Sequence, residues 1–375
     1  MLTYCTNIHP GETWKDVRAN LDSHLLEVKQ CISPHAPFPV GLRLSAQAAR
    51  ELDEREAQRF SAWCAESDCF VLSVNGFPYG PFHGTSVKEA VYLPDWRDPE
   101  RVDYTRRLAD LLAGWLPSGV VGSISTVPVA FAAGFAEEHW PGVRRHVVET
   151  LQHFDEIRQS GGPSIVLAFE PEPCCVLETS AQALRFFERM ELPAQLADLA
   201  GICFDCCHQA VEFEEPEAGL ELLRAAGVKI GKVQISSALR VLPHELDAIA
   251  TFDEPTYLHQ VVARWHDGCL TRHPDLPDFL ATLTDERRSR LVECRVHFHV
   301  PIFAEHLGHC GTTRSFLETL LPQLSHLAPD AALEVETYSW GVLPESLRSP
   351  RVATDIVREL EWARRHLEGR PLEGR

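Results

Sequence analysis

Residues 201–210 are GICFDCCHQA, a stretch that places two patterns of metal-binding side chains at the end of an apolar run. Cys203 and Cys206 form a CxxC pair, whereas Asp205 and His208 form a DxxH pair. An apolar run of this length is typical of a strand buried on both faces. Because side chains alternate along a strand, Cys203 and Asp205 share a face, and we expect that face to point inward.

The rest of the chain repeats this arrangement, in which a short apolar run is followed by a longer amphipathic stretch. The alternation predicts parallel strands joined by helices, and about eight such units predict a (β/α)8 TIM barrel that forms one domain over residues 1–375. A doubly wound open sheet is the alternative, but no GxGxxG follows the first run. The predicted strands are residues 2–7, 40–44, 69–75, 120–126, 165–170, 201–205 and 229–235, and a last one that begins at Leu333.

Two of the predicted helices have clear start signals. Residues 14–32 carry apolar side chains on one helical face, and Thr13 in front of them is a typical N-cap. Asp98 and Pro99 begin a second helix, as a cap followed by proline at the first helical position.

One long segment interrupts the alternation after the seventh strand. Residues 236–295 are rich in Pro, His and Asp, and an additional strand-like stretch, CRVHFHVPIF, follows at 294–303. We interpret residues 236–300 as an insertion in the seventh strand-to-helix connection, which forms a lid or wall over the mouth of the barrel.

Composition excludes several classes of protein. The net charge of −19 opposes binding to nucleic acid, because a phosphate backbone is bound largely through Lys and Arg. No apolar run reaches the roughly 18 residues of a membrane span, and nothing at the N-terminus is typical of a signal peptide, so we expect a cytoplasmic protein. The twelve cysteines are scattered, as is typical of reduced, buried thiols.

Polar residues are concentrated where the predicted strands end, which is where the active site of a TIM barrel lies. Glu170, Asp205 and Glu336 each follow an apolar run, and a buried carboxylate there would lack a partner unless a cation neutralised it. Glu172, between two prolines, is typical of a solvated turn. The other strand-end residues, for which structural and functional interpretations both stay open, are Asn7, His9, Asn75, Tyr79, His83, His208, Gln234, Ser236, His297 and His299.

The DxxH pair is the better source of metal ligands than the CxxC pair. A zinc knuckle needs a second pair of thiols or imidazoles, and Cys174 and Cys175 are adjacent rather than correctly spaced. Asp205 at the strand tip and His208 one turn later are able to converge on one point. We therefore interpret the cysteines as small apolar residues that fill the core.

A glutamate at the end of strand five, DxxH at the end of strand six and a glutamate at the end of strand eight resemble the xylose isomerase-like TIM barrels. That superfamily holds divalent-metal sugar isomerases and epimerases, inosose dehydratase-type enzymes and endonuclease IV-type nucleases. The motifs YCTNIHPGETW (4–14), NGFPYGPFHG (75–84), VKEAVYLPDW (87–96) and HFHVPIF (297–303) more closely resemble the EboE proteins, described as metabolite-traffic proteins. The resemblance spans nearly the whole chain.

The resemblance implies one divalent ion, Mn, Mg, Co or Zn. In the isomerases a glutamate, an aspartate, a histidine and a second glutamate hold the ion, and Glu170, Asp205 and Glu336 match three of these ligands. Gln234 stands where the histidine is expected. Either the carbonyl oxygen of Gln234 or the imidazole of His299 is then the fourth ligand.

The resemblance also implies a mechanism. A cation chelated by a hydroxy-carbonyl substrate would acidify the α-carbon proton, and Glu170 and Glu336 would remove and return that proton. His208 would donate a hydrogen bond to the carbonyl oxygen. The residues expected to bind the polyol are Asn7, His9, Asn75 and His83, with Trp340 or Phe77 as an apolar wall.

Three functions stay open from the sequence. The first is a metal-dependent isomerase, epimerase or dehydratase that acts on a sugar, polyol or cyclitol. The second is a non-catalytic carrier of such a metabolite, consistent with the description of the EboE proteins. The third is a zinc phosphodiesterase of the endonuclease IV type. EboE proteins accompany biosynthetic clusters with prenyltransferase-like and dehydroquinate synthase-like enzymes, so other proteins of such a cluster are expected partners.

Overall fold

Eight parallel strands close into a barrel in the computed structural model, which describes residues 1–84, 87–343 and 348–369. Their order around the barrel is β1-β14-β7-β6-β5-β4-β3-β2, and a bridge between Cys5 and Gly41 joins β1 to β2. The predicted parallel barrel is therefore confirmed. The strands are β1 (Leu2–Tyr4), β2 (Phe38–Arg43), β3 (Cys69–Asn75), β4 (Gly122–Thr126), β5 (Ile165–Phe169), β6 (Ala200–Asp205), β7 (Lys229–Ile235) and β14 (Ala332–Val335).

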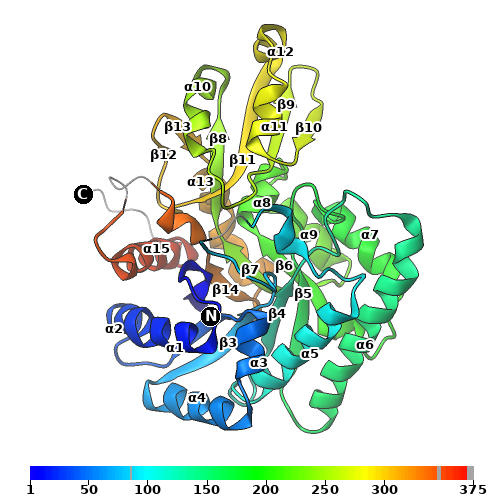
Figure 1. Cartoon of the computed structure of the whole chain (residues 1–375), viewed down its shortest axis with the longest axis vertical. Coiled ribbons are helices and arrows are strands. Elements are labelled where there is room, and N and C mark those ends of the chain that lie inside the picture. Colours follow the sequence, from blue (N-terminus) through cyan, green and yellow to red (C-terminus); the bar gives the residue numbers. More distant parts are fainter. Residues whose placement is uncertain (85–86, 344–347, 370–375) are drawn as a thin grey trace.

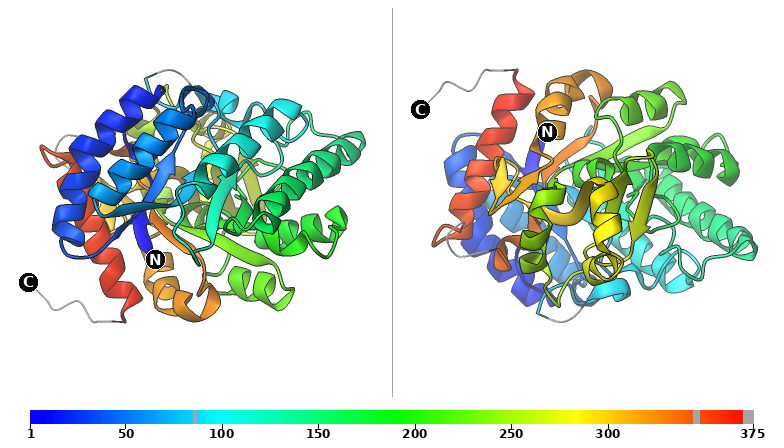
Figure 2. Two further views of the ribbon diagram at one scale, coloured as in Figure 1. Left: turned by 90° about the horizontal axis from the view of Figure 1, so that it is seen from below. Right: turned by 90° about the horizontal axis from the view of Figure 1, so that it is seen from above.

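Helices surround these strands on the outside (Figures 1 and 2). Both predicted start signals are confirmed, since Thr13 accepts a hydrogen bond from the Asp16 amide and Asp98 accepts one from the Glu100 amide. A π-helical turn at Leu21–Leu25 joins α1 to α2. The helices are α1 (Trp14–Asn20), α2 (Leu26–Ile32), α3 (Ala46–Glu51), α4 (Glu54–Glu66), α5 (Pro99–Ala113), α6 (Trp140–Gln159), α7 (Ser180–Met190), α8 (Cys206–Val211), α9 (Ala218–Ala225), α13 (Arg314–Leu320), α14 (Leu324–Leu327) and α15 (Val352–Leu367).

A second, antiparallel sheet of six strands projects from one end of the barrel and lies in front of it in the right-hand view of Figure 2. All six strands fall between β7 and β14 in the chain, and the last ends at Thr312, beyond the predicted boundary at residue 300. A role of this segment as a lid stays a prediction. Its elements are β8 (Ser237–Val241), α10 (Leu246–Ile249), β9 (Val261–Trp265), β10 (Leu270–His273), α11 (Leu276–Ala281), α12 (Asp285–Arg290), β11 (Leu291–Val300), β12 (His306–Leu307) and β13 (Cys310–Thr312).

No helix within residues 1–84, 87–343 and 348–369 combines the length and the apolar character that crossing a membrane requires.

The barrel interior contains a fully buried ion pair below the strand ends. Lys232 Nζ lies 2.8 Å from Glu334 Oε2, and neither side chain is exposed. Burial alone would lower the pKa of Lys232, but the charge of Glu334 raises it above its ordinary value. Ser73 donates a hydrogen bond to the same carboxylate. Gly41 is required beside it, because a Cβ at that position would lie 2.6 Å from the Glu334 carboxyl carbon.

We predict that Lys232→Met destabilises the protein by about 3–5 kcal/mol, because Glu334 would keep a buried charge without its partner. The double variant Lys232→Met/Glu334→Leu should recover most of this loss, since neither charge remains. Urea unfolding followed by circular dichroism measures both free energies of unfolding. A single variant as stable as the wild type would show that the pair is not needed for folding.

Candidate active site

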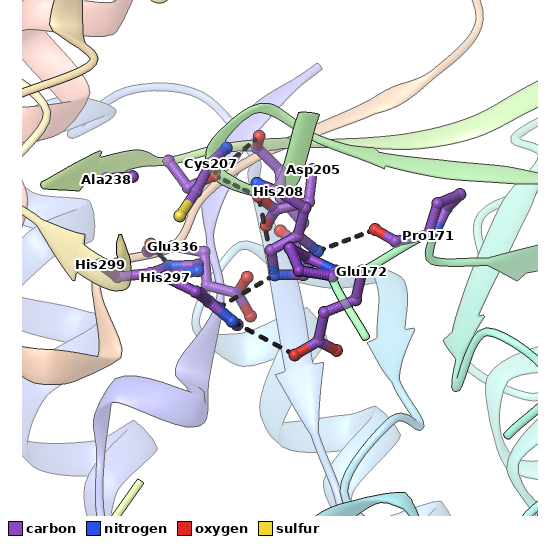
Figure 3. A network of polar contacts seen from close by, with 12 residues as sticks. Pro171, Glu172, Asp205, Cys207, His208, Ala238, His297, His299 and Glu336 are labelled. Atoms are coloured by element: carbon purple, nitrogen blue, oxygen red, sulfur yellow. Dashed lines mark hydrogen bonds and ion pairs between the residues drawn. The ribbon is translucent and has the colours of Figure 1, made fainter. Parts of the chain in front are cut away.

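A pocket opens where the barrel strands end and β11 of the second sheet reaches over them. Figure 3 shows that Asp205, Glu336 and His208 from the barrel lie close to His297 and His299 from β11. The residues that line the pocket are Asn7, Asn75, Phe77, Pro78, Phe82, Val87, Lys88, Val91, Tyr92, Glu170, Glu172, His208, Tyr257, Leu258, His297, His299, Glu336 and Tyr338.

Glu170, Asp205 and Glu336 converge on one point beside this pocket. Glu170 follows β5, Asp205 ends β6 and Glu336 follows β14, so the barrel brings together residues that are far apart in sequence. One carboxylate oxygen from each lies within 4.8 Å of the other two, and all three side chains are buried. This spacing suits three ligands of one cation, whereas three carboxylates alone repel one another.

Two asparagines hold the Glu336 carboxylate. The side-chain amides of Asn7 and Asn75 donate to Glu336 Oε1 at 2.6 and 3.1 Å. The Asn75 carbonyl oxygen accepts from the Phe77 amide at 3.1 Å, which fixes the direction in which the Asn75 amide points. Asn7 and Asn75 therefore lie at the pocket, as predicted for substrate contacts, but in this structure their amide groups bind Glu336.

The DxxH spacing follows from helix capping. Asp205 is the N-cap of α8, and its Oδ1 accepts from the His208 amide at 2.9 Å and from the Ser236 hydroxyl at 2.8 Å. Asp205 Oδ2 accepts no hydrogen bond although it is buried. The cap thus fixes one oxygen of Asp205 and leaves the other directed to the site.

Four further buried polar atoms near these carboxylates also lack a hydrogen-bond partner. They are Glu170 Oε2, both side-chain atoms of Gln234, and His299 Nε2. Gln234 is paired with Asp205 in the sheet register and shares the inward face of β7 with Lys232. Buried polar atoms are rarely left unpaired, so this concentration fits a divalent cation bound mainly by oxygen.

Burial and mutual repulsion change the acidity of these carboxyl groups. Burial, followed by the charges of Glu336 and Asp205, raises the pKa of Glu170 well above its ordinary value. Burial and the charge of Asp205 likewise raise the pKa of Glu336. Burial opposes ionisation of Asp205 too, but His208, His299 and the hydrogen bonds to its Oδ1 outweigh it and lower the pKa.

Three of the predicted substrate-binding residues are not brought to this pocket. His9, His83 and Trp340 line a neighbouring cavity, and the tyrosines Tyr257 and Tyr338 border both cavities. His9 Nε2 lies 3.1 Å from the Tyr4 hydroxyl, and Trp340 donates to Glu359 at 3.2 Å. Their predicted contact with the polyol would require a ligand that extends past the two tyrosines.

The solvated-turn interpretation of Glu172 is wrong. Glu172 is buried, and its Oε1 accepts from the Tyr92 hydroxyl at 2.6 Å and from the Gln260 amide at 2.9 Å. Burial opposes its ionisation, but His297, His208 and Tyr92 together lower its pKa to about 2. No sequence pattern indicates Gln260, whereas the alternation of His297 and His299 on one strand predicts that both face the same way.

All twelve cysteines are free thiols. Burial, followed by the charge of Glu170, raises the pKa of Cys203, which lies on the inward face of β6. Cys206 packs in the main core, and Cys207 packs against Val211 and Ala238. The Cys207 thiol also lies within 4.8 Å of ring nitrogens of the two β11 histidines, and replacing it tests whether it binds metal.

No model of a known protein family matches the chain, and no curated protein matches it. Several solved structures do. A xylose isomerase-like TIM barrel protein from Mycobacterium smegmatis, in complex with magnesium, is 12% identical with a TM-score of 0.54, over 98% of this chain and 96% of that one. The chain has the fold of the xylose isomerase-like TIM barrels.

Two further structures with this fold cover almost all of the chain. L-ribulose 3-epimerase is 12% identical with a TM-score of 0.51, over 100% of this chain and 98% of that one. The IOLI protein with a bound zinc atom is 13% identical with a TM-score of 0.50, over 99% of both chains. At these identities the comparison establishes the fold and leaves the site to be argued from this chain's own residues.

We predict that Cys206→Ser/Cys207→Ser leaves the number of bound metal ions unchanged, because oxygen and imidazole groups supply the ligands. Elemental analysis of the purified variant and the wild type measures this number. Loss of a full equivalent of metal in the double variant would restore the thiolate interpretation.

We predict that divalent cations bind more tightly as the pH rises above the ordinary range of a carboxyl group and that binding releases protons. Glu170 and Glu336 have raised pKa values, so the cation-free protein retains protons there that bound metal displaces. Calorimetric titration in two buffers of different ionisation enthalpy measures the number of protons released. Equal heats in both buffers would contradict the assignment.

Proposed function

We propose that the protein is a divalent-metal-dependent isomerase or epimerase that acts on a sugar or cyclitol. The observation that carries the proposal is the convergence of Glu170, Asp205 and Glu336, with unpartnered buried atoms, at the carboxyl ends of the barrel strands. Two findings support it: the fold is shared with L-ribulose 3-epimerase, and structures with this fold hold magnesium or zinc.

The proposed ligands are Glu170, Asp205 and Glu336, with Gln234 or His299 as the fourth. When bound there, a divalent cation would increase the acidity of a carbon-bound proton next to a substrate carbonyl. Glu170, Asp205, Gln234 and His299 each have a buried oxygen or nitrogen without a hydrogen-bond partner. Hard cations such as Mg²⁺ and Mn²⁺ prefer a set of this kind, in which oxygen dominates.

The two glutamates differ in how they are held, and this difference supports a separate role for each. Glu170 Oε2 accepts no hydrogen bond, so it is free to take a proton from carbon. Glu336 Oε1 is fixed by the amides of Asn7 and Asn75, which suits a group that returns a proton from a defined position. His208 lines the pocket and would donate to the carbonyl oxygen of the substrate.

The pocket suits a small ring compound. Aromatic side chains of its lining provide faces against which the C–H groups of a monosaccharide or cyclitol ring pack. The aromatic residues of the lining are Phe77, Phe82, Tyr92, Tyr257 and Tyr338.

The sequence motifs extend the proposal to a biological setting. They resemble the EboE proteins, so we place the enzyme in a secondary-metabolite biosynthesis or export pathway in the cytoplasm. Its expected partners are other proteins of the same biosynthetic cluster.

We predict that Glu336→Gln lowers metal affinity and isomerase or epimerase activity together, because it removes both a ligand charge and a proton donor. Activity is measured with a panel of ketoses and inososes after loading with Mn²⁺, by exchange of the substrate α-proton for deuterium. A loss of about 10²–10⁴-fold is expected for removal of a general acid or base. Glu214→Gln, a glutamate outside the pocket, is the matched control.

Two outcomes would overturn this function. Full exchange activity in Glu336→Gln would show that the carboxylate takes no part. A wild-type protein that binds members of the panel without exchanging any proton would instead be a metabolite carrier that retains the pocket of an enzyme.

A further inference from the structure

A second cavity lies beyond Tyr257 and Tyr338, the two tyrosines that also border the pocket of the carboxylates. Its volume is about 540 Å³. Nitrogen donors dominate its polar lining, although the chain as a whole carries a net charge of −19. These donors are His9, His24, His83 and Arg348, and none of them takes part in the proposed isomerase chemistry.

The four donors come from four separate segments of the chain. His9 follows β1, His83 lies between β3 and α5, and Arg348 precedes α15. His24 lies in the π-helical turn between α1 and α2, and π-helical turns are rare and frequently occur at functional sites. This turn stacks the His24 ring on that of His9, with centroids 4.6 Å apart and planes 13° apart. Donors that approach from several sides suit an anion with oxygens on several sides, such as phosphate.

The imidazole of His83 lacks partners within the described part of the chain. Both of its ring nitrogens are buried, and neither has a hydrogen-bond partner. A neutral imidazole has one donor and one acceptor, and buried polar atoms are rarely left unpaired. A ligand that accepts a hydrogen bond from this ring would satisfy its donor.

The imidazole of His9 also has a donor to spare. Its Nε2 lies 3.1 Å from the buried Tyr4 hydroxyl, and this is the one hydrogen bond of either group within the described residues. Burial raises the pKa of Tyr4, so the hydroxyl keeps its proton and donates it to Nε2. The proton of the neutral His9 ring then lies on Nδ1, where it is available to a ligand.

Positive charge in the cavity has no negative partner among these histidines. Burial, followed by the charges of His24 and His83, lowers the pKa of His9 to about 3. Burial, followed by the charge of Arg43, lowers the pKa of His83 to about 4. Both rings are therefore neutral near pH 7, and each offers one N–H group rather than a charge.

Arg348 supplies the permanent charge of the cavity. Its Nη1 donates to the Gly341 carbonyl oxygen at 3.2 Å, and no carboxylate among the described residues forms a salt bridge with it. Asp355, the single carboxylate of the described lining, instead accepts from the amide and hydroxyl of Ser349 at 2.8 and 2.7 Å. A guanidinium has five N–H donors, so most of those on Arg348 remain for an anion.

We propose that this cavity binds a phosphate group, held by the guanidinium of Arg348 and by N–H groups of His9 and His83. The phosphate either belongs to the substrate, on an arm that passes Tyr257 and Tyr338, or binds separately beside the active site. The proposal goes beyond the proposed function, and its test requires no turnover.

Calorimetric titration of inorganic phosphate into the full-length, Mg²⁺-loaded protein at fixed ionic strength tests the proposal. We expect one equivalent in the wild type and an affinity that falls roughly 10–100-fold in Arg348→Gln, as for a lost charge-assisted hydrogen bond. Arg348→Lys keeps the charge and should recover part of the loss. Arg351→Gln is the matched control, because Arg351 is exposed and pairs with Glu27 outside the cavity.

A second variant addresses the imidazoles and keeps the test independent of Arg348. His83→Leu should also weaken phosphate binding, whereas His83→Gln retains a donor and should bind more tightly than His83→Leu. Circular dichroism of each variant checks that the fold is retained.

Three outcomes would overturn the proposal. They are the absence of saturable binding in the wild type, an unchanged affinity in Arg348→Gln, and an equal loss in Arg351→Gln. A loss in Glu336→Gln with full binding in Arg348→Gln would place the phosphate on the metal and would contradict the proposal as well.

A cyclitol phosphate distinguishes the two sources of the phosphate group. If the group belongs to the substrate, myo-inositol 1-phosphate should bind more tightly than inorganic phosphate, and both Arg348→Gln and Glu336→Gln should weaken it. If the anion binds separately, the two probes should bind equally, and only Arg348→Gln should weaken them.

The experiment also separates this proposal from the proposed function. Protein that binds phosphate through Arg348 but exchanges no substrate proton would remove the isomerase assignment and leave the phosphate site standing. Active protein that binds no phosphate would do the reverse.

Discussion

Negative charge concentrated along the barrel axis is the constraint on which the site depends. Glu334 and Lys232 neutralise one another in a lower layer, where the pair is sealed from water. Glu170, Asp205 and Glu336 share the layer above, within 4.8 Å of one another. The lysine is already committed to Glu334, so it offsets only part of this charge. The upper layer is stable in its ionised form when a cation joins it, and otherwise it must retain protons.

The two sheets supply different kinds of polar side chain to the pocket. The barrel contributes carboxylates at its strand ends, because parallel strands meet at one edge and cannot avoid placing them together. The second sheet contributes nitrogen, through His297 and His299 on β11, and an amide, Gln260, just before β9. The side-chain carbonyl of Gln260 contacts Nδ1 of His297, and the backbone carbonyl of Glu336 contacts Nδ1 of His299. The pocket is therefore lined from both the barrel and the inserted segment.

The strands and the carboxylates could be predicted because both depend on local pattern. A carboxylate that directly follows an apolar run is predicted to be buried, as at Glu170 and Asp205. Glu172 could not be predicted, since its burial comes from Tyr92 and Gln260, which are distant in sequence. His9 lies near a strand end, as expected, but the 3-10 turn at Thr6–Ile8 directs Asn7 to Glu336 and His9 towards Tyr4. Proximity to a strand end predicts where the backbone of a residue lies but not the direction in which its side chain points.

In the proposed metal site, a histidine from the second sheet takes the place of a barrel ligand. Gln234 stands where related barrels are expected to carry an imidazole, and a neutral amide binds a cation more weakly than a histidine. His299 reaches the same region from β11, with an unpartnered Nε2 and a ligand atom within 4.8 Å of Asp205. On the proposed assignment the imidazole has moved from the barrel to the second sheet. A bound cation would then link the two sheets directly, so that metal binding and the position of β11 depend on each other.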